Sequence, residues 1–181
     1  MATKVELLTA EDLLRFPRHR RGELVNGIFI EMVPPAPEHG GVAAETARAL
    51  GNHVRPGRLG RVLVEGGFIL RRHPDTVRFP DVAFVRAERI PAEGLPRRYW
   101  HLTPDLVVEV ISPNDTPAEI EARLQEWLEA GAPLVWLLYP ESRSVQAARS
   151  LLDRVILGPD QTLDGGDVLP AFTIRVADLF E

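Results

Sequence analysis

Glu109 is the residue whose place in the sequence most clearly indicates a functional role. It lies inside the apolar run 106–111, which is bounded by Pro104 and Pro113 and is typical of a strand buried on both faces. An ionised carboxylate is very costly to bury without a partner. A metal ion, an arginine or a bound proton must therefore compensate Glu109.

Asp81 is a second acid in strand-like sequence, between Pro80 and the apolar residues 82–85. If this strand lies beside the strand of Glu109, two carboxylates converge, and the backbone carbonyl of Val110 offers a third oxygen. Magnesium prefers oxygen ligands, and a metal held in this way can activate water and stabilise charge on a phosphodiester. The sequence leaves a plainer alternative open, in which Asp81 caps a turn and Glu109 pairs with an arginine.

Several other kinds of catalytic site are excluded by residues that the chain lacks. It has no cysteine, so there is no thiolate nucleophile, and it has no glycine-rich phosphate loop with a lysine. The single lysine is Lys4. No pair among the five histidines has the spacing of zinc ligands, and no Gly-x-Ser-x-Gly motif occurs. What remains is a set of acids on strands.

The first half of the chain predicts two helices, a hairpin and two strands. Asn26-Gly27 between apolar runs is the strongest short signal for a tight turn. Residues 38–54 carry apolar side chains at helical spacing. In order, these elements are a helix from Thr9 to Phe16, a hairpin over 23–32, a helix over 38–54, a strand over 61–70 interrupted at Gly66-Gly67, and a single strand over 77–85.

The second half predicts a strand, a helix and a strand around Glu109. Thr116 and Glu119 form a capping box before the helix, and Gly131 suits its C-terminal cap. An apolar strand follows at 133–139. A strand, a helix and a strand in this order imply a right-handed crossover between parallel strands. The fold class is therefore α/β or α+β, a mixed sheet flanked by helices with an N-terminal helix and hairpin.

Composition describes a single globular domain over residues 1–181, because 45% of the residues are hydrophobic and 26% are charged. No apolar run reaches the roughly 20 residues that a membrane helix needs. The N-terminus lacks the apolar core of a signal peptide, so we expect a cytoplasmic protein.

The net charge of -5 argues against a broad nucleic-acid surface. The basic residues 18–21 could still contact phosphate or form an ordinary solvated loop.

A series of short motifs runs through most of the chain in a fixed order. Pro80-Asp81, followed at a distance by Glu109-Val110-Ile111, resembles the signature of PD-(D/E)XK nucleases. Taken together, the motifs resemble the Uma-type restriction endonuclease family of that superfamily. The further matching pieces are Gly22-Glu23-Leu-Val-Asn-Gly, Pro34-Pro35 with His39, residues 104–113, the helix end at 124–131, and residues 134–140.

The resemblance implies a restriction-endonuclease-like core with a Mg²⁺ or Mn²⁺ site that hydrolyses DNA. It assigns the metal to Asp81 and Glu109, beside which the carbonyl of Val110 is the further candidate ligand, and it places Arg123 where the family carries a lysine on the following helix. By analogy with the superfamily, we expect a homodimer, because two cuts in a duplex need two sites. The implied catalytic residues are Asp81, Glu109, Arg123, His39 and Glu23, with Glu45 as a further candidate acid.

Arg123 leaves two functions open. Arginine stays protonated in proteins, with a pKa above about 12, so it cannot act as a base, although it can polarise water or stabilise charge on phosphate. The chain is then either a metal-dependent endonuclease with impaired catalysis or an inactive nuclease fold that binds nucleic acid or a protein partner. Plain structural roles also remain open: a surface pair of Arg123 with Glu119, a surface position for His39, and pairing of Glu23 with residues 18–21.

Overall fold

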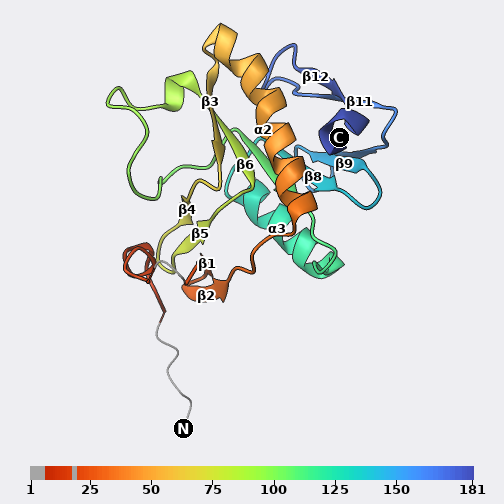
Figure 1. Ribbon diagram of the computed structural model, residues 1–181. Helices are drawn as coiled ribbons and strands as arrows, with labels where there is room; N and C mark the ends of the chain where they lie inside the picture. The colour runs from red at the N-terminus through yellow and green to blue at the C-terminus, as the bar shows by residue number, and fades with distance from the viewer. Residues whose placement is uncertain (1–6, 18–19) are drawn as a thin grey trace. The chain divides into compact units, whose positions relative to one another are not determined.

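The chain separates into two compact units in a computed structural model that describes residues 7–17 and 20–181 (Figure 1). The predicted phosphate contact by Arg18 and His19, like Lys4, lies outside these described residues. The smaller unit comprises Met1–Pro34, Gly67–Phe79 and Pro96–Thr103, and the larger unit comprises Pro35–Gly66, Pro80–Leu95 and Pro104–Glu181.

The smaller unit holds a short helix and a four-stranded antiparallel sheet in the order β2-β1-β5-β4. Thr9 caps the helix in a capping box with Asp12. Asn26 and Gly27 have φ of 52° and 76° and make the predicted hairpin turn. The elements are α1 (Ala10–Leu13), β1 (Gly22–Val25), β2 (Ile28–Glu31), β4 (Phe68–Arg71) and β5 (Thr76–Arg78).

The larger unit is built on a six-stranded mixed sheet in the order β10-β9-β8-β7-β6-β3, in which only β7 and β8 are parallel neighbours. This confirms the predicted mixed sheet and the predicted parallel pair. Its strands are β3 (Gly60–Val64), β6 (Val82–Arg86), β7 (Leu106–Val110), β8 (Leu134–Tyr139), β9 (Ser144–Ala148) and β10 (Arg154–Leu157). The remaining elements are a hairpin of β11 (Thr162–Asp164) and β12 (Thr173–Arg175), and the 3-10 helices η1 (Ala87–Arg89) and η2 (Val176–Phe180).

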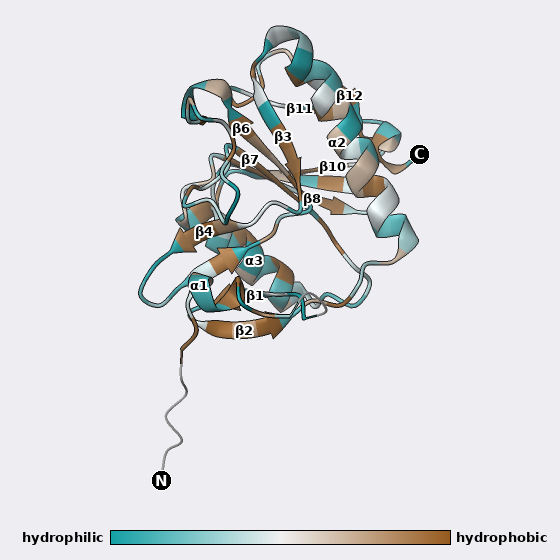
Figure 2. Cartoon of the chain, turned by 60° about the vertical axis from the view of Figure 1, so that its left-hand side comes forward, coloured by the Kyte–Doolittle hydropathy of each residue, from teal (hydrophilic) through white to brown (hydrophobic). Residues whose placement is uncertain are grey.

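Two helices, α2 (Pro37–Gly57) and α3 (Pro117–Glu129), cover opposite faces of this sheet. Val108 packs in the same core cluster as Leu50 of α2, whereas the neighbouring Glu109 is bonded to Trp127 of α3. Successive strand residues point to opposite faces, so the two helices must lie on either side. Every residue of β7 is buried, as predicted, and Figure 2 shows hydrophobic colouring along β6, β7 and β8.

The boundaries of α3 agree with the sequence signals. Thr116 and Glu119 form the capping box, a proline stands in the first turn, and Gly131 follows the helix with φ of 95°. Leu124 and Trp127 are its buried residues. No helix in the described part of the chain combines the length and apolar character needed to cross a bilayer.

The prediction of one strand over 77–85 is wrong. The segment forms two strands, β5 and β6, which belong to the sheets of different units and are separated around Pro80 and Asp81. Proline has no N–H to donate to a ladder, so pairing is interrupted there. The interruption leaves Asp81, one of the candidate metal ligands, just outside the start of β6.

Candidate active site

Asp81 lies beside the end of β7, where Glu109 is found. Strands β6 and β7 are antiparallel neighbours with Val82 opposite Val108, so the residue before Val82 comes next to the residues after Val108. The backbone N–H of Val110 donates a 2.7 Å hydrogen bond to Oδ2 of Asp81. Two segments about 30 positions apart in the chain therefore bring their acids to one end of the sheet.

Glu109 is buried, with 6% of its surface exposed, and it has two neighbours on α3. The indole N–H of Trp127 donates a 2.7 Å hydrogen bond to Oε1 of Glu109. Nη1 of Arg123 lies 3.7 Å from Oε2. The sequence required a partner for this carboxylate, and the structure supplies a neutral donor and a cation on different oxygens.

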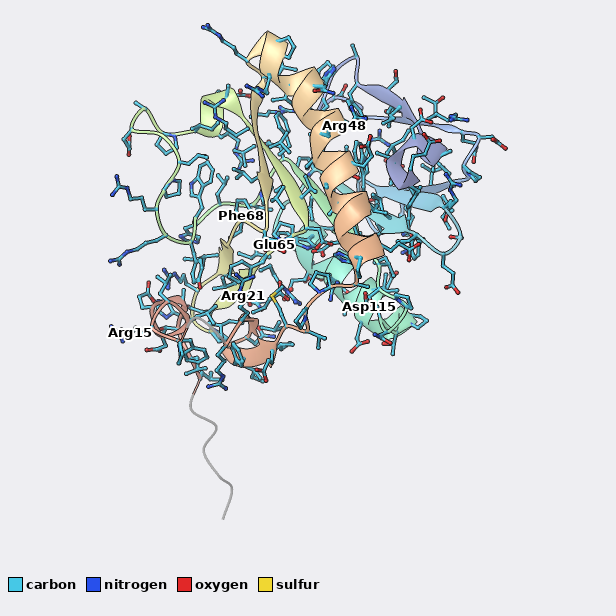
Figure 3. All side chains as sticks on the ribbon, viewed as in Figure 1. Arg15, Arg21, Arg48, Glu65, Phe68 and Asp115 are labelled. Carbon is cyan, nitrogen blue, oxygen red and sulfur yellow. The ribbon has the colours of Figure 1, made fainter. Side chains whose placement is uncertain are left out.

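Arg123 lies between two acids. Its Nη2 is 3.9 Å from Oδ1 of Asp115, in addition to its approach to Glu109. Asp115 is itself fixed, because its Oδ2 accepts a 2.8 Å hydrogen bond from the N–H of Ser112 (Figure 3 labels Asp115 near the start of α3). Glu119, the alternative partner, uses its carboxylate to cap the helix at Thr116. The guanidinium of Arg123 thus lies next to the two acids that flank the loop after β7.

His39 stands in the first turn of α2, with its Nε2 3.4 Å from Oδ2 of Asp81. The side chains are 17% and 19% exposed. The hydrogen bond to Asp81 raises the pKa of His39; burial opposes this, while the charge of Asp81, the backbone of Val110 and the charge of Asp115 add to it. In the larger unit, His39 therefore lies beside Asp81 and Arg123 lies beside Glu109, while the catalytic roles assigned to these four residues stay predictions.

Glu23 and Glu45 have other partners. Glu23 belongs to the smaller unit, where its carboxylate accepts hydrogen bonds from Arg78 at 2.6 Å and from the N–H of Phe79 at 2.9 Å. Glu45 pairs with Arg48 on the next turn of α2, which lowers the pKa of Glu45 (Figure 3 labels Arg48). The catalytic roles assigned to these two glutamates stay predictions.

The oxygen atoms at the end of β7 suit a hard cation. Asp81 and Glu109 supply carboxylates, and the backbone of Val110 supplies a carbonyl. The described residues contain no group of three or more His, Cys, Asp or Glu side chains arranged to hold a metal. A zinc site needs such a group, whereas Mg²⁺ is commonly held by one or two carboxylates and keeps several waters.

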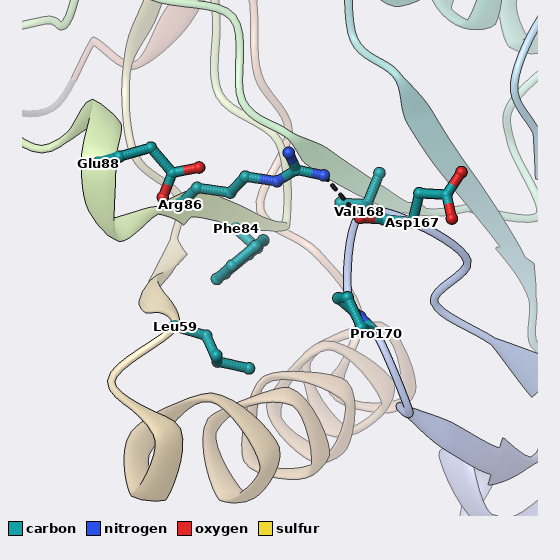
Figure 4. A pocket seen from close by; sticks show the side chains of 7 residues that line it. All are labelled: Leu59, Phe84, Arg86, Glu88, Asp167, Val168 and Pro170. Atoms are coloured by element: carbon teal, nitrogen blue, oxygen red, sulfur yellow. Dashed lines mark hydrogen bonds between the residues drawn. The ribbon is translucent and has the colours of Figure 1, made fainter.

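A pocket of about 240 Å³ lies at the opposite end of β6 (Figure 4). Arg86 lines this pocket, and its guanidinium donates a 2.7 Å hydrogen bond to the backbone carbonyl of Asp167. The Nε of Arg86 lies 3.8 Å from Oδ1 of Asp105. The one cation among the described residues that line this pocket is therefore paired within the protein. The lining residues are Leu59, Phe84, Arg86, Glu88, Asp167, Val168 and Pro170.

Two residues of the site escaped the sequence analysis. Neither Trp127 nor Asp115 was among the candidate residues. The signal that could have found Trp127 is its place one helical turn after Arg123, on the helix that follows the buried acid. Asp115 stands four residues after Ile111, where the chain leaves β7.

The mixed sheet and its two covering helices form an α+β fold. The chain belongs to the Uma2 family, whose description is "Putative restriction endonuclease" and whose model matches residues 10–177. A crystal structure from Anabaena variabilis, described as "a putative nuclease belonging to DUF820", has the same fold, with a TM-score of 0.83 and 21% sequence identity. The match covers 96% of this chain and 97% of that chain. Among proteins with curated descriptions, none matches this chain.

Proposed function

We propose that this protein is a metal-dependent endonuclease that hydrolyses phosphodiester bonds in DNA. The observation that carries the proposal is the hydrogen bond from Val110 to Asp81, which brings the Asp81 carboxylate to the residue that follows Glu109. Membership of a family described as restriction endonucleases supports the same activity.

The residues at the end of β7 would have three different roles: metal binding, orientation of a metal ligand, and binding of phosphate. Asp81, Glu109 and the carbonyl of Val110 would hold Mg²⁺ or Mn²⁺; such an ion, when bound, lowers the pKa of a coordinated water and offsets charge on the phosphate. His39 donates a hydrogen bond toward Asp81 and so fixes that carboxylate. Arg123 remains a cation throughout and binds a phosphate oxygen, where it stabilises developing charge.

Cleavage of plasmid DNA tests the proposal. Purified protein with Mg²⁺ or Mn²⁺ should convert supercoiled plasmid to nicked and linear forms, and EDTA should stop the conversion. Asp81→Asn keeps the size of the side chain and an acceptor for Val110 but removes the charge, so it should abolish cleavage. Cleavage by the parent that persists in EDTA, or equal cleavage by Asp81→Asn, would contradict the proposal.

A second function is favoured by one observation, the arginine at position 123. A guanidinium cannot take a proton from water, and here it lies near both Glu109 and Asp115. An inactive nuclease fold that binds DNA without cutting would have these properties. It predicts DNA binding by the parent without cleavage, and it predicts that cleavage appears only in Arg123→Lys.

A homodimer would place two such sites on one duplex. Light scattering after size-exclusion chromatography should then give about twice the 20.2 kDa mass of the chain.

A further inference from the structure

Trp127 is the residue that fixes the orientation of the Glu109 carboxylate. The indole N–H and Oε1 are 2.7 Å apart, within the ordinary range for a hydrogen bond to a charged acceptor. Trp127 is 1% exposed and Glu109 is 6% exposed, so the bond is shielded from water. The two side chains meet between α3 and the face of β7 opposite to α2.

The two oxygens of Glu109 therefore have different surroundings. Oε1 accepts from the indole, and Oε2 lies 3.7 Å from the guanidinium of Arg123. We propose that Trp127 is a positioning residue, which holds Glu109 by Oε1 so that Oε2 serves as the metal ligand. This inference rests on the proposed function, because it concerns the same metal centre.

The chemistry of the donor supports this role. An indole N–H is neutral and donates only, so it satisfies one oxygen of the buried carboxylate without cancelling its charge. The negative charge of Glu109 is then shared only with cations, which are Arg123 at 3.7 Å from Oε2 and the proposed metal ion. Partners beyond the ligands themselves commonly orient metal ligands, and their removal weakens metal affinity by about 10–100-fold.

Trp136 provides a matched control within the same sheet. It is fully buried, and its position on β8 is opposite Val108. It packs in the core cluster on the α2 face, and its indole N–H has no hydrogen-bond partner among the residues that the structure describes. Trp136→Phe thus removes the same bulk from the core as Trp127→Phe but removes no bond to Glu109.

Calorimetric titration with Mn²⁺ tests the inference without any measurement of activity. Trp127→Phe should bind Mn²⁺ at least about tenfold more weakly than the parent. Trp136→Phe should stay within about twofold, even though both variants lose stability from the core. Equal affinity of the two variants would overturn the role of Trp127. Failure of the parent itself to bind Mn²⁺ would instead remove the whole proposed metal centre.

Fluorescence gives a second test that does not depend on how well Trp127→Phe folds. The chain has three tryptophans, so the double variant Trp100→Phe/Trp136→Phe leaves Trp127 as the sole emitter. Saturating Mg²⁺ should change the emission of Trp127, because its hydrogen-bond acceptor becomes a metal ligand. Unchanged emission, in a variant shown by calorimetry to bind metal, would overturn the inference.

Discussion

The backbone N–H of Val110 donates a 2.7 Å hydrogen bond to the carboxylate of Asp81. The donor belongs to the residue directly after Glu109, and the acceptor directly precedes β6, so this single bond ties the two acids to one end of the sheet. His39 approaches the same oxygen of Asp81 from the first turn of α2. The position of Asp81 thus depends on the backbone of β7 and on one imidazole.

Glu109→Gln should separate catalysis from stability. The amide oxygen can still accept from Trp127, and Arg123 loses little with this partner because its side chain is 27% exposed and also lies near Asp115. The free energy of unfolding, measured by urea denaturation, should fall by less than about 1 kcal/mol. Cleavage should drop by roughly a thousandfold, the scale of the several kcal/mol that a bound metal supplies. A variant that cuts like the parent would exclude Glu109 from the site.

Arg123→Met and Arg123→Lys test the positive charge that α3 places near Glu109. Methionine keeps an unbranched stem without the cation, so cleavage should fall by more than about tenfold because phosphate charge is no longer stabilised. Lysine keeps the charge and adds a group whose pKa can shift, so cleavage should be retained or increased. Both variants are compared with the parent in the plasmid assay at equal Mg²⁺. Cleavage by Arg123→Met at the rate of the parent would show that Arg123 takes no part.

Asp75 should make the smaller unit sensitive to acid. Its buried carboxylate accepts hydrogen bonds from the N–H of Ala10 at 2.8 Å and from Arg72 at 2.7 Å. Burial raises the pKa of Asp75, but these bonds, a bond from the N–H of His73 and the Arg72 charge outweigh it, so the pKa lies below its usual value.

A carboxyl with a lowered folded pKa stabilises the fold above its unfolded pKa, about 3.9, and loses that contribution as the pH falls through the folded value. Urea denaturation of the parent should therefore show stability falling below about pH 4, and Asp75→Asn should show a weaker fall. Glu11→Gln, which alters the more exposed partner of Arg72, is the control and should have a smaller effect. An effect of Glu11→Gln as large as that of Asp75→Asn would contradict the account.

Thr116→Ala should weaken the helix that carries Arg123 and Trp127. The hydroxyl of Thr116 accepts from the N–H of Glu119, and Glu119 in turn accepts from the N–H of Thr116 at 2.8 Å. Loss of such a cap costs about 1 kcal/mol, or roughly 2–4 °C in Tm for a chain of this size. Thr116→Ser keeps the hydroxyl and should retain the parent's Tm in a thermal melt. An equal loss in both variants would mean that the cap is not the cause.

Local signals were sufficient for most element boundaries. The capping box at Thr116 and the turn at Asn26-Gly27 act within a few residues, so the sequence alone predicts them. The division of 77–85 into β5 and β6 was not predicted, because its apolar residues run on past Pro80. Which sheet each half joins depends on partners far away in the chain, and no local pattern records them.

The candidate site, too, could be predicted only where the signal is local in the sequence. Asp81 and Glu109 stood out because charge is rare in buried strands, and the motif resemblance linked them. Trp127 did not stand out in the sequence, because an aromatic residue on the apolar stripe of a helix is usually an ordinary core residue. Its indole N–H acquires a role only when α3 packs over β7, beside Glu109.

A crystal of the protein soaked in Mn²⁺ tests the central claim most directly, through an anomalous difference map. The account predicts one strong peak about 2.0–2.3 Å from carboxylate oxygens of both Asp81 and Glu109, the range in which small hard cations bind oxygen. A map with no peak there at saturating Mn²⁺, or with a peak that touches neither carboxylate, would contradict it.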